Sequence, residues 1–287
     1  MRDEPQIQRT KRFDWRNLRQ RAMSAFVLAP LAILAVVAPS IGWLGSWPFL
    51  VVMAAAIALL AHEWSVMTSR ERPLGIALSI AIGLLAAEFV AYRGHYHLAW
   101  LVLLAAIVAC AVIAMILRTR PLDAAFGAFY LGGPCLALTW VRLGAQDGLA
   151  WTILLLAVTW AADIGAFAVG NIVGGPKLWP RFSPNKTWSG FIGGLVVAMA
   201  VGASVTVAFQ SHMRLSLSAA ALMGLIGGLA TMAGDLLESI LKRRFGVKDS
   251  GDLIPGHGGL LDRVDGLMFA ILAVAGARLI HLAGWDA

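Results

Sequence analysis

Charged side chains are scarce in this sequence. They make up 14% of its 287 residues, whereas 59% of the residues are hydrophobic. A soluble globular domain carries charge at about 25% of its positions, and one water-soluble core cannot bury so much apolar surface. The shortage of charge therefore excludes an ordinary soluble domain and indicates a protein embedded in lipid.

Cysteine and acidic residues are also few. The two cysteines, Cys110 and Cys135, lie in apolar runs with no histidine or second cysteine at metal-binding spacing, which excludes a disulfide framework and a cysteine-based zinc site. The net charge of +7 is explained by membrane topology and by attraction to anionic lipid headgroups. Nucleic acid is therefore not expected as a partner.

Long apolar runs dominate what is present. A helix needs about 17 to 25 such residues to cross about 30 Å of hydrocarbon. We therefore predict an all-α, polytopic integral membrane protein with about nine transmembrane helices. The expected spans are 22–38, 43–60, 74–91, 98–117, 124–141, 149–169, 190–209, 217–233 and 266–282.

The basic residues predict the orientation, because cytoplasmic loops are enriched in Lys and Arg. Threading the chain through these spans places the basic tail 1–21 and most of the 23 Lys and Arg residues on one side. Only four fall on the other side: Arg93, Arg142, Arg214 and Arg278. The N-terminus is therefore predicted in the cytoplasm and the tail 283–287 outside.

The two halves of the chain differ in character. Residues 22–150 form an expected scaffold of about five helices with few ionisable groups, Glu63 and Glu88 being the exceptions. Glu63 is expected near the interface with a structural role. Residues 151–287 form an expected catalytic region of about four helices, whose cytoplasmic loops 170–189 and 234–265 combine Gly, Pro, charge and hydroxyl groups.

The first of these loops follows an acid within a span, Asp163, which needs a partner or a proton at that depth. The loop ends in Ser183, Asn185, Lys186 and Thr187, just before an apolar helix. Hydroxyls, a cation and unpaired backbone N–H groups at a helix N-terminus can hold phosphate. The alternative is that Ser183 or Thr187 is an ordinary N-cap and that Lys186 reflects only the enrichment of positive charge in cytoplasmic loops.

The second loop begins with a patterned polar segment. Helical spacing places one set of side chains on a common face: Asp235, Glu238, Ser239, Lys242 and Arg243. The segment that follows, through Gly256, Gly258 and Gly259, is too rich in glycine to be helical and suits close backbone approach to an anionic ligand.

Carboxylates at two helix ends suggest a metal site. Asp235 on one helix, with Asp262 and Asp265 at the start of the next, suits Mg²⁺, which also bridges to substrate phosphates. Nearby cations can neutralise those phosphates, namely Lys242, Arg243, Lys248 and Arg263. His257 is either a phosphate ligand or general acid, or a hydrogen-bonded fixture. The alternative is an ordinary cytoplasmic loop, whose basic residues follow the positive-inside rule and whose acids form solvated ion pairs that contribute little to stability.

The segment 239–265 resembles the signature of phosphatidate cytidylyltransferases, also called CDP-diacylglycerol synthases. Two further family features are similar to segments 162–188 and 234–239. Two positions depart from the family pattern: Ser189 stands where Glu is usual, and Phe167 where Tyr is common. The first half resembles the family only as a set of membrane spans.

The resemblance implies transfer of a cytidylyl group from CTP to phosphatidic acid, giving CDP-diacylglycerol and pyrophosphate for phospholipid biosynthesis. It further implies Mg²⁺, with room for a second cation, a homodimer, and a bacterial inner membrane with the active site facing the cytoplasm. The implied catalytic residues are Lys242, Arg243, Lys248, Asp249, His257 and Arg263. The implied substrate-binding residues are Asp163, Ser183, Asn185, Lys186, Thr187, Ser239, Gly256, Gly258 and Gly259, and the implied metal ligands are Asp235, Asp262 and Asp265.

Two other functions fit the residues. A CTP-dependent lipid kinase would use similar phosphate and metal groups but transfer the terminal phosphoryl. A transporter or lipid flippase would also carry acids at membrane depth, although no convincing repeat relates the two halves, as many transporter folds would require.

Overall fold

The computed structural model describes residues 30–69, 71–144, 147–180, 183–213, 215–251 and 258–284. The basic tail 1–21, the first part of the span expected at 22–38, and the predicted site residues Gly256 and His257 lie outside these ranges. Within them the chain is helical except for short connections and one small hairpin. The all-α prediction is therefore confirmed.

Eight helices in the described ranges are long and apolar enough to cross a membrane. They are α2 (Trp47–Thr68), α3 (Pro73–Tyr92), α4 (Tyr96–Ile116), α5 (Pro121–Leu143), α6 (Gly148–Val173), α7 (Trp188–Ala208), α9 (Leu217–Arg244) and α10 (Leu261–Leu282). These match eight of the expected spans. The described part of the first expected span is the shorter apolar helix Pro30–Ser40, whose last turn is the 3₁₀ segment η1 (Ala38–Ser40).

Local sequence signals explain several helix ends. Proline occupies the first turn of α2, α3 and α5, where its missing N–H has no intrahelical partner to lose. The short helix α8 (Gln210–Met213) connects α7 to α9. Beyond its expected apolar span, α9 continues to Arg244, which confirms the helix that the spacing of Asp235 to Arg243 indicates.

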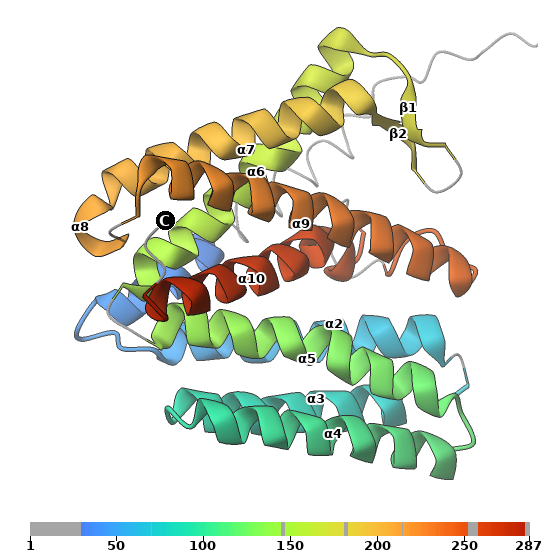
Figure 1. Cartoon of the computed structure of the whole chain (residues 1–287). Helices are drawn as coiled ribbons and strands as arrows, with labels where there is room; N and C mark the ends of the chain where they lie inside the picture. The colour runs from blue at the N-terminus through green and yellow to red at the C-terminus, as the bar shows by residue number, and fades with distance from the viewer. Residues whose placement is uncertain are drawn as a thin grey trace, which may run out of the picture.

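The helices pack as two joined bundles, in which α2 to α5 form one group and α6 to α10 the other (Figure 1). Each bundle has a core of buried apolar side chains. Helix α10 packs against both α9 and α5 and so joins the two groups. The hairpin and the end of α9 lie at the same end of the assembly.

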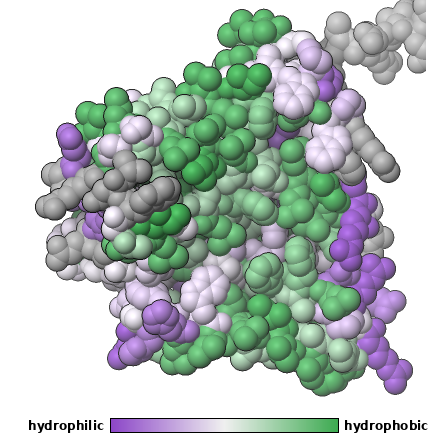
Figure 2. Space-filling model, viewed as in Figure 1, coloured by the Kyte–Doolittle hydropathy of each residue, from purple (hydrophilic) through white to green (hydrophobic). Residues whose placement is uncertain are grey.

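The outer surface is apolar. Ile82, Leu101 and Ile192 are each more than half exposed, and Figure 2 shows hydrophobic residues across one face, with hydrophilic residues gathered at its edges. Contiguous apolar surface of this extent is unfavourable in water and suits lipid. With the eight apolar helices, it makes the chain a multi-pass membrane protein.

Small residues bring the helices of the second bundle into backbone contact. A Cβ atom added at Gly224 would lie 2.3 Å from the carbonyl oxygen of Ala198, and one at Gly194 would lie 2.7 Å from that of Ala162. Helices α9 and α10 meet in the same way, because a Cβ on Gly234 would lie 2.5 Å from the carbonyl oxygen of Asp265. Glycine permits such close crossings in membranes, and this one brings the backbone beside Asp235 against that of Asp265.

Candidate active site

A two-stranded hairpin closes one side of the candidate site. Strands β1 (Lys177–Trp179) and β2 (Ser183–Thr187) pair antiparallel between α6 and α7. Gly174 and Gly175, with φ of 64° and 103°, form the turn after α6 because glycine tolerates positive φ. Ser189, at the start of α7, donates a short hydrogen bond to the carbonyl of Gly174, so the two ends of the hairpin are joined.

Thr187 caps α7. Its hydroxyl oxygen accepts a hydrogen bond from the backbone N–H of Gly190 at 3.1 Å, which satisfies one of the unpaired donors of the first turn. This is the ordinary N-cap that the sequence allowed as an alternative. The cap orients the strand that carries Lys186 immediately before it.

A cavity of about 620 Å³ lies between the hairpin and α6, α7 and α9. Its polar lining includes Asp163, Lys177, Asn185, Lys186 and Asp235. Apolar side chains line it as well, among them Phe167, Phe191 and Met232. Such a cavity can receive a charged group together with an apolar one, as a lipid headgroup and the start of its chains would require.

An ion pair crosses the cavity wall. Lys186 on β2 donates to the carboxylate of Asp235 on α9, and Asp163 on α6 lies within electrostatic range of both groups. The side chains of Lys186 and Asp235 are 30% and 36% exposed, so both reach the cavity. The ammonium of Lys186 thus occupies a position where a metal cation would contact Asp235.

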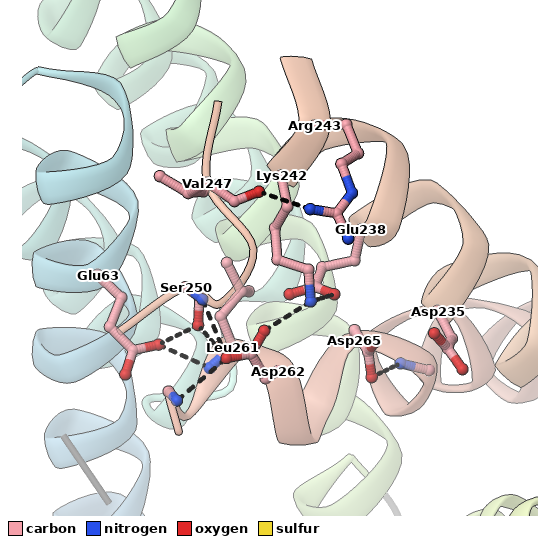
Figure 3. Close-up of polar contacts among 12 residues, drawn as sticks. Glu63, Asp235, Glu238, Lys242, Arg243, Val247, Ser250, Leu261, Asp262 and Asp265 are labelled. Carbon is pink, nitrogen blue, oxygen red and sulfur yellow. Dashed lines mark hydrogen bonds and ion pairs between the residues drawn. The ribbon is translucent and has the colours of Figure 1, made fainter. Parts of the chain in front are cut away.

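Asp265 approaches the same place from α10. Its carboxylate accepts from the N–H of Gly266 at 2.7 Å and lies within electrostatic range of Asp235, Lys186 and Lys242. The close contact of α9 and α10 at Gly234 explains this proximity. Figure 3 shows Asp235 and Asp265 on these neighbouring helices.

A second charged cluster centres on Lys242 (Figure 3). Its ammonium lies 2.6 Å from a carboxylate oxygen of Glu238 and 2.7 Å from one of Asp262. Asp262 also accepts from the N–H and hydroxyl of Ser250, each at 3.0 Å, and from the N–H of Gly259 at 3.1 Å. Lys242 therefore links α9 to α10, and Asp262 holds the two ends of the glycine-rich segment.

Glu63 enters this cluster from α2, far away in the sequence. It is 1% exposed and accepts from the N–H groups of Leu260 and Leu261, each at 2.7 Å. The hydroxyl of Ser250 donates to it at 3.2 Å. A residue of the first bundle thus contacts the start of α10.

The carboxylates can be tested for their fit to Mg²⁺. In the part of the chain that the structure describes, no group of three or more His, Cys, Asp or Glu side chains is arranged to hold a metal. The oxygens of Asp262 are already occupied by protein donors. Asp235 and Asp265 remain, and one or two carboxylates suffice for Mg²⁺ that shares its coordination with waters and substrate phosphates. This pair fits such an ion.

The sequence profile described as the cytidylyltransferase family matches residues 19–280. The chain belongs to that family. It is 37% identical over 277 residues to the phosphatidate cytidylyltransferase of Brucella suis biovar 1 (strain 1330), covering 93% of each chain. It is 39% identical over 150 residues to that of Staphylococcus haemolyticus (strain JCSC1435), covering 52% of this chain and 57% of the relative.

The comparisons confirm the resemblance read from the sequence and make this cytidylyltransferase a nucleotidyltransferase enzyme. The structure brings its predicted site residues into two adjacent groups. The cavity group contains Asp163, Asn185, Lys186, Thr187 and Asp235, with Asp265 beside it. The second group contains Lys242, Asp262, Gly258 and Gly259.

The remaining predicted residues of the cytidylyltransferase that the structure describes lie on the elements that form these groups or next to them in the chain. Ser183 and Ser239 are half-buried on β2 and α9. Several charged side chains are exposed near the end of α9 and the start of α10: Arg243, Lys248, Asp249 and Arg263. Arg243 also reaches the carbonyl of Val247 at 3.5 Å.

The described part of the glycine-rich segment contacts carboxylates of the enzyme itself. Its expected approach to an anionic ligand stays a prediction. A Cβ on Gly259 would lie 2.9 Å from an oxygen of Glu63, and one on Gly258 would lie 3.3 Å from an oxygen of Asp262. The backbone amides at the start of α10 are therefore already paired with protein carboxylates.

Sequence reasoning missed one buried acid, Glu63, as a member of this site, and it placed Glu238 on the polar face without assigning it a role. The available signal was the presence of an acid in an apolar run, which is costly unless the acid is paired. That signal indicates a partner without naming it. Glu63 was expected to be structural, and its contacts now connect it to the second group.

Proposed function

We propose that this cytidylyltransferase transfers the cytidylyl group of CTP to phosphatidic acid, producing CDP-diacylglycerol and pyrophosphate for phospholipid biosynthesis. The observation that carries the proposal is the amphipathic cavity in which Lys186, Asp235 and Asp163 meet. The names of its curated relatives support the same substrates.

In this reaction a phosphate oxygen of the lipid attacks the α-phosphorus of CTP. A P–O bond forms there, the bond between the α-phosphorus and the bridging oxygen breaks, and pyrophosphate leaves. A phosphate monoester is already anionic near neutral pH, so the enzyme has no proton to remove. Its main task is to hold two mutually repelling anions in line.

The cations of the chain suit that task. Lys177 and Lys186 line the cavity and are placed to hold the lipid phosphate. Arg243, Lys248 and Arg263 are exposed near the end of α9 and the start of α10, and in this proposal they contact the triphosphate. Lys242 has a different role, because it lies between Glu238 and Asp262 with its side chain only 14% exposed.

Asp235 and Asp265 would hold Mg²⁺, which supplies positive charge to the phosphates as negative charge shifts toward the leaving pyrophosphate. Lys186 pairs with Asp235 at the same place. The chain's own contribution is to keep these two carboxylates side by side, which the contact of Gly234 with α10 does.

We further propose that the enzyme lies in a bacterial inner membrane with this site facing the cytoplasm. The distribution of Lys and Arg supports that orientation.

A homodimer is proposed on the family resemblance. Light scattering of the detergent-solubilised protein, corrected for bound detergent, tests it. A monomeric mass in active preparations would contradict the dimer.

The activity is tested with purified protein in phosphatidylcholine nanodiscs containing phosphatidic acid. With CTP labelled at the α-phosphate, we expect label in the lipid fraction and release of pyrophosphate, both requiring phosphatidic acid and Mg²⁺. With the same α-labelled CTP, a lipid kinase would leave the label in CDP and release no pyrophosphate. A flippase would move lipid without consuming CTP, so either result would contradict the proposal.

Replacing Gly234 with alanine is expected to lower activity more than tenfold. The added Cβ would lie 2.5 Å from the backbone oxygen of Asp265 and 3.0 Å from the Cα of Gly266, so α9 and α10 must separate. Overpacking of this kind costs about 1–3 kcal/mol and moves Asp235 away from Asp265. The measurements are kcat and the thermal midpoint of the purified protein.

Gly276→Ala provides a matched control on α10, because a Cβ there meets nothing within 4 Å. This variant is expected to keep wild-type activity and stability. Equal effects of the two substitutions would show that the close crossing at Gly234 does not position the site.

A further inference from the structure

We propose that Glu63, a residue of the first bundle, is a positioning residue for catalysis: its carboxylate holds the start of α10 and thereby orients Asp262 and Asp265. The activity part of this inference rests on the proposed function. The structural part can be measured independently of it.

The burial of Glu63 requires an explanation. Its side chain is 1% exposed on an apolar helix, where an unpaired carboxylate is strongly unfavourable. It is compensated by the amides of Leu260 and Leu261 and by the hydroxyl of Ser250, whose single proton is shared between Glu63 and Asp262. Every one of these donors comes from the glycine-rich segment or from the first turn of α10.

Helix α10 lacks a local cap. Its N-cap residue is Leu260, which has no side chain able to accept a hydrogen bond. The first amides of a helix have no intrahelical acceptor, and a negative charge there interacts favourably with the helix dipole. Glu63 supplies that acceptor and charge from α2, across 197 positions of sequence.

The contact is connected to the second charged group. The hydroxyl of Ser250 lies 3.2 Å from Glu63 and 3.0 Å from Asp262, and Asp262 in turn binds Lys242 at 2.7 Å. A continuous chain of polar contacts therefore runs from α2 through α10 to α9 (Figure 3). Asp265 lies one turn beyond Asp262 on the helix that Glu63 caps.

The backbone is shaped around this carboxylate. A Cβ on Gly259 would lie 2.0 Å from the hydroxyl oxygen of Ser250 and 2.9 Å from Glu63, and one on Gly251 would lie 3.3 Å from Glu63. The backbone at Gly251 and at Gly259 thus lies so close to Glu63 that a side chain at either position would crowd the carboxylate. The carboxylate also occupies the amides that a substrate phosphate would otherwise use at this helix start.

The decisive variant is Glu63→Gln, compared with Glu88→Gln. Glu88 is a buried acid of the neighbouring helix α3 that accepts from Thr139 at 2.7 Å and has no recorded contact with the site. In full-length protein in nanodiscs, we measure hydrogen exchange of the amides of Leu260 and Leu261, together with kcat and KM for CTP. Glu63→Asp, which keeps the charge on a shorter side chain, is the conservative variant.

We expect Glu63→Gln to accelerate exchange at these two amides and to lower kcat by about 10- to 100-fold, the range seen when outer partners of a site are removed. KM for CTP should change by less than about threefold, since no substrate contact is removed. Glu63→Asp should recover part of kcat, and Glu88→Gln should leave both the exchange and kcat as in the wild type.

Wild-type exchange in Glu63→Gln, or an equal loss of kcat in Glu88→Gln, would overturn the inference. If Glu63→Gln does not fold, Ser250→Ala decides, because it removes one donor and leaves the buried carboxylate paired with two amides. It should lower kcat with little change in the thermal midpoint, and unchanged kcat would reject the chain of contacts. Were the wild type inactive with CTP, the proposed function would fail while the exchange result would still stand.

Discussion

Asp235→Asn is expected to abolish transfer of the CTP α-phosphate to lipid, with a fall in kcat of at least about 10³-fold. The substitution removes the carboxylate that faces both the cavity and Lys186 and leaves Asp265 as the only member of the proposed metal pair. Loss of one group that stabilises transition-state charge commonly costs about 10² to 10³ in kcat. In the proposed mechanism the Mg²⁺ would be lost as well.

The same variant should remain folded. Lys186 and Asp235 are each about one-third exposed, so their ion pair contributes no more than about 1 kcal/mol to stability. We therefore expect a thermal midpoint close to that of the wild type. Added Mg²⁺ should raise the midpoint of the wild type in the presence of CTP but not that of the variant.

Glu71→Gln is the control, because Glu71 is an exposed acid in the connection between α2 and α3. It should keep wild-type kcat and the Mg²⁺ response. Activity of Asp235→Asn within threefold of the wild type would remove Asp235 from the proposed mechanism and would require another residue to bind the metal.

Lys242→Met is expected to reduce both stability and activity. Lys242 is the shared partner of Glu238 and Asp262, whose side chains are only 2% and 10% exposed. Removing one member of a buried ion pair leaves the other charge uncompensated, which costs about 3–5 kcal/mol. The connection between α9 and α10 is lost with it, so kcat should fall as well.

A double variant separates these effects. Lys242→Met with Glu238→Gln removes the cation and one buried anion together, and should recover part of the lost stability relative to Lys242→Met alone. Activity should not recover, because Asp262 still lacks its partner. Arg93→Gln, an exposed position after α3, is the control for loss of one positive charge.

The thermal midpoints and kcat values of Lys242→Met, the double variant and Arg93→Gln, each compared with the wild type, decide the role of Lys242. If Lys242→Met is as stable as the wild type yet inactive, the lysine contacts substrate phosphate and does not support the fold. That result would contradict the interpretation that Lys242 is a cross-link between helices.

The membrane architecture was predictable because the signals for it are local. The length of an apolar run such as 98–117 can be counted directly in the sequence, and that length shows whether the helix can cross the bilayer. The polar end of α9 was predictable from a second local signal, because helical spacing places Asp235 and Lys242 on one face beyond the end of the apolar run. Helix propensity and hydropathy are separate properties.

The identities of the charged site residues were also predictable. Asp235, Asp262 and Asp265 belong to short motifs that could be read along the chain. Their distribution was not, because the sequence interpretation placed all three around one ion. In the structure Asp235 lines the cavity and Asp265 lies within electrostatic range of it, while Ser250, Gly259 and Lys242 donate to Asp262.

Sequence alone thus established a multi-span helical membrane protein, its family and the segments that carry its charged groups. Each of these depends only on the composition or the order of residues within a short stretch of the chain. Tertiary structure alone decided which of those groups meet. Glu63 contacts amides 197 and 198 positions away, and Asp235 comes beside Asp265 because Gly234 allows two backbones to touch. Such pairings depend on how helices cross, and a carboxylate in an apolar run shows that a partner is needed without specifying which helix supplies it.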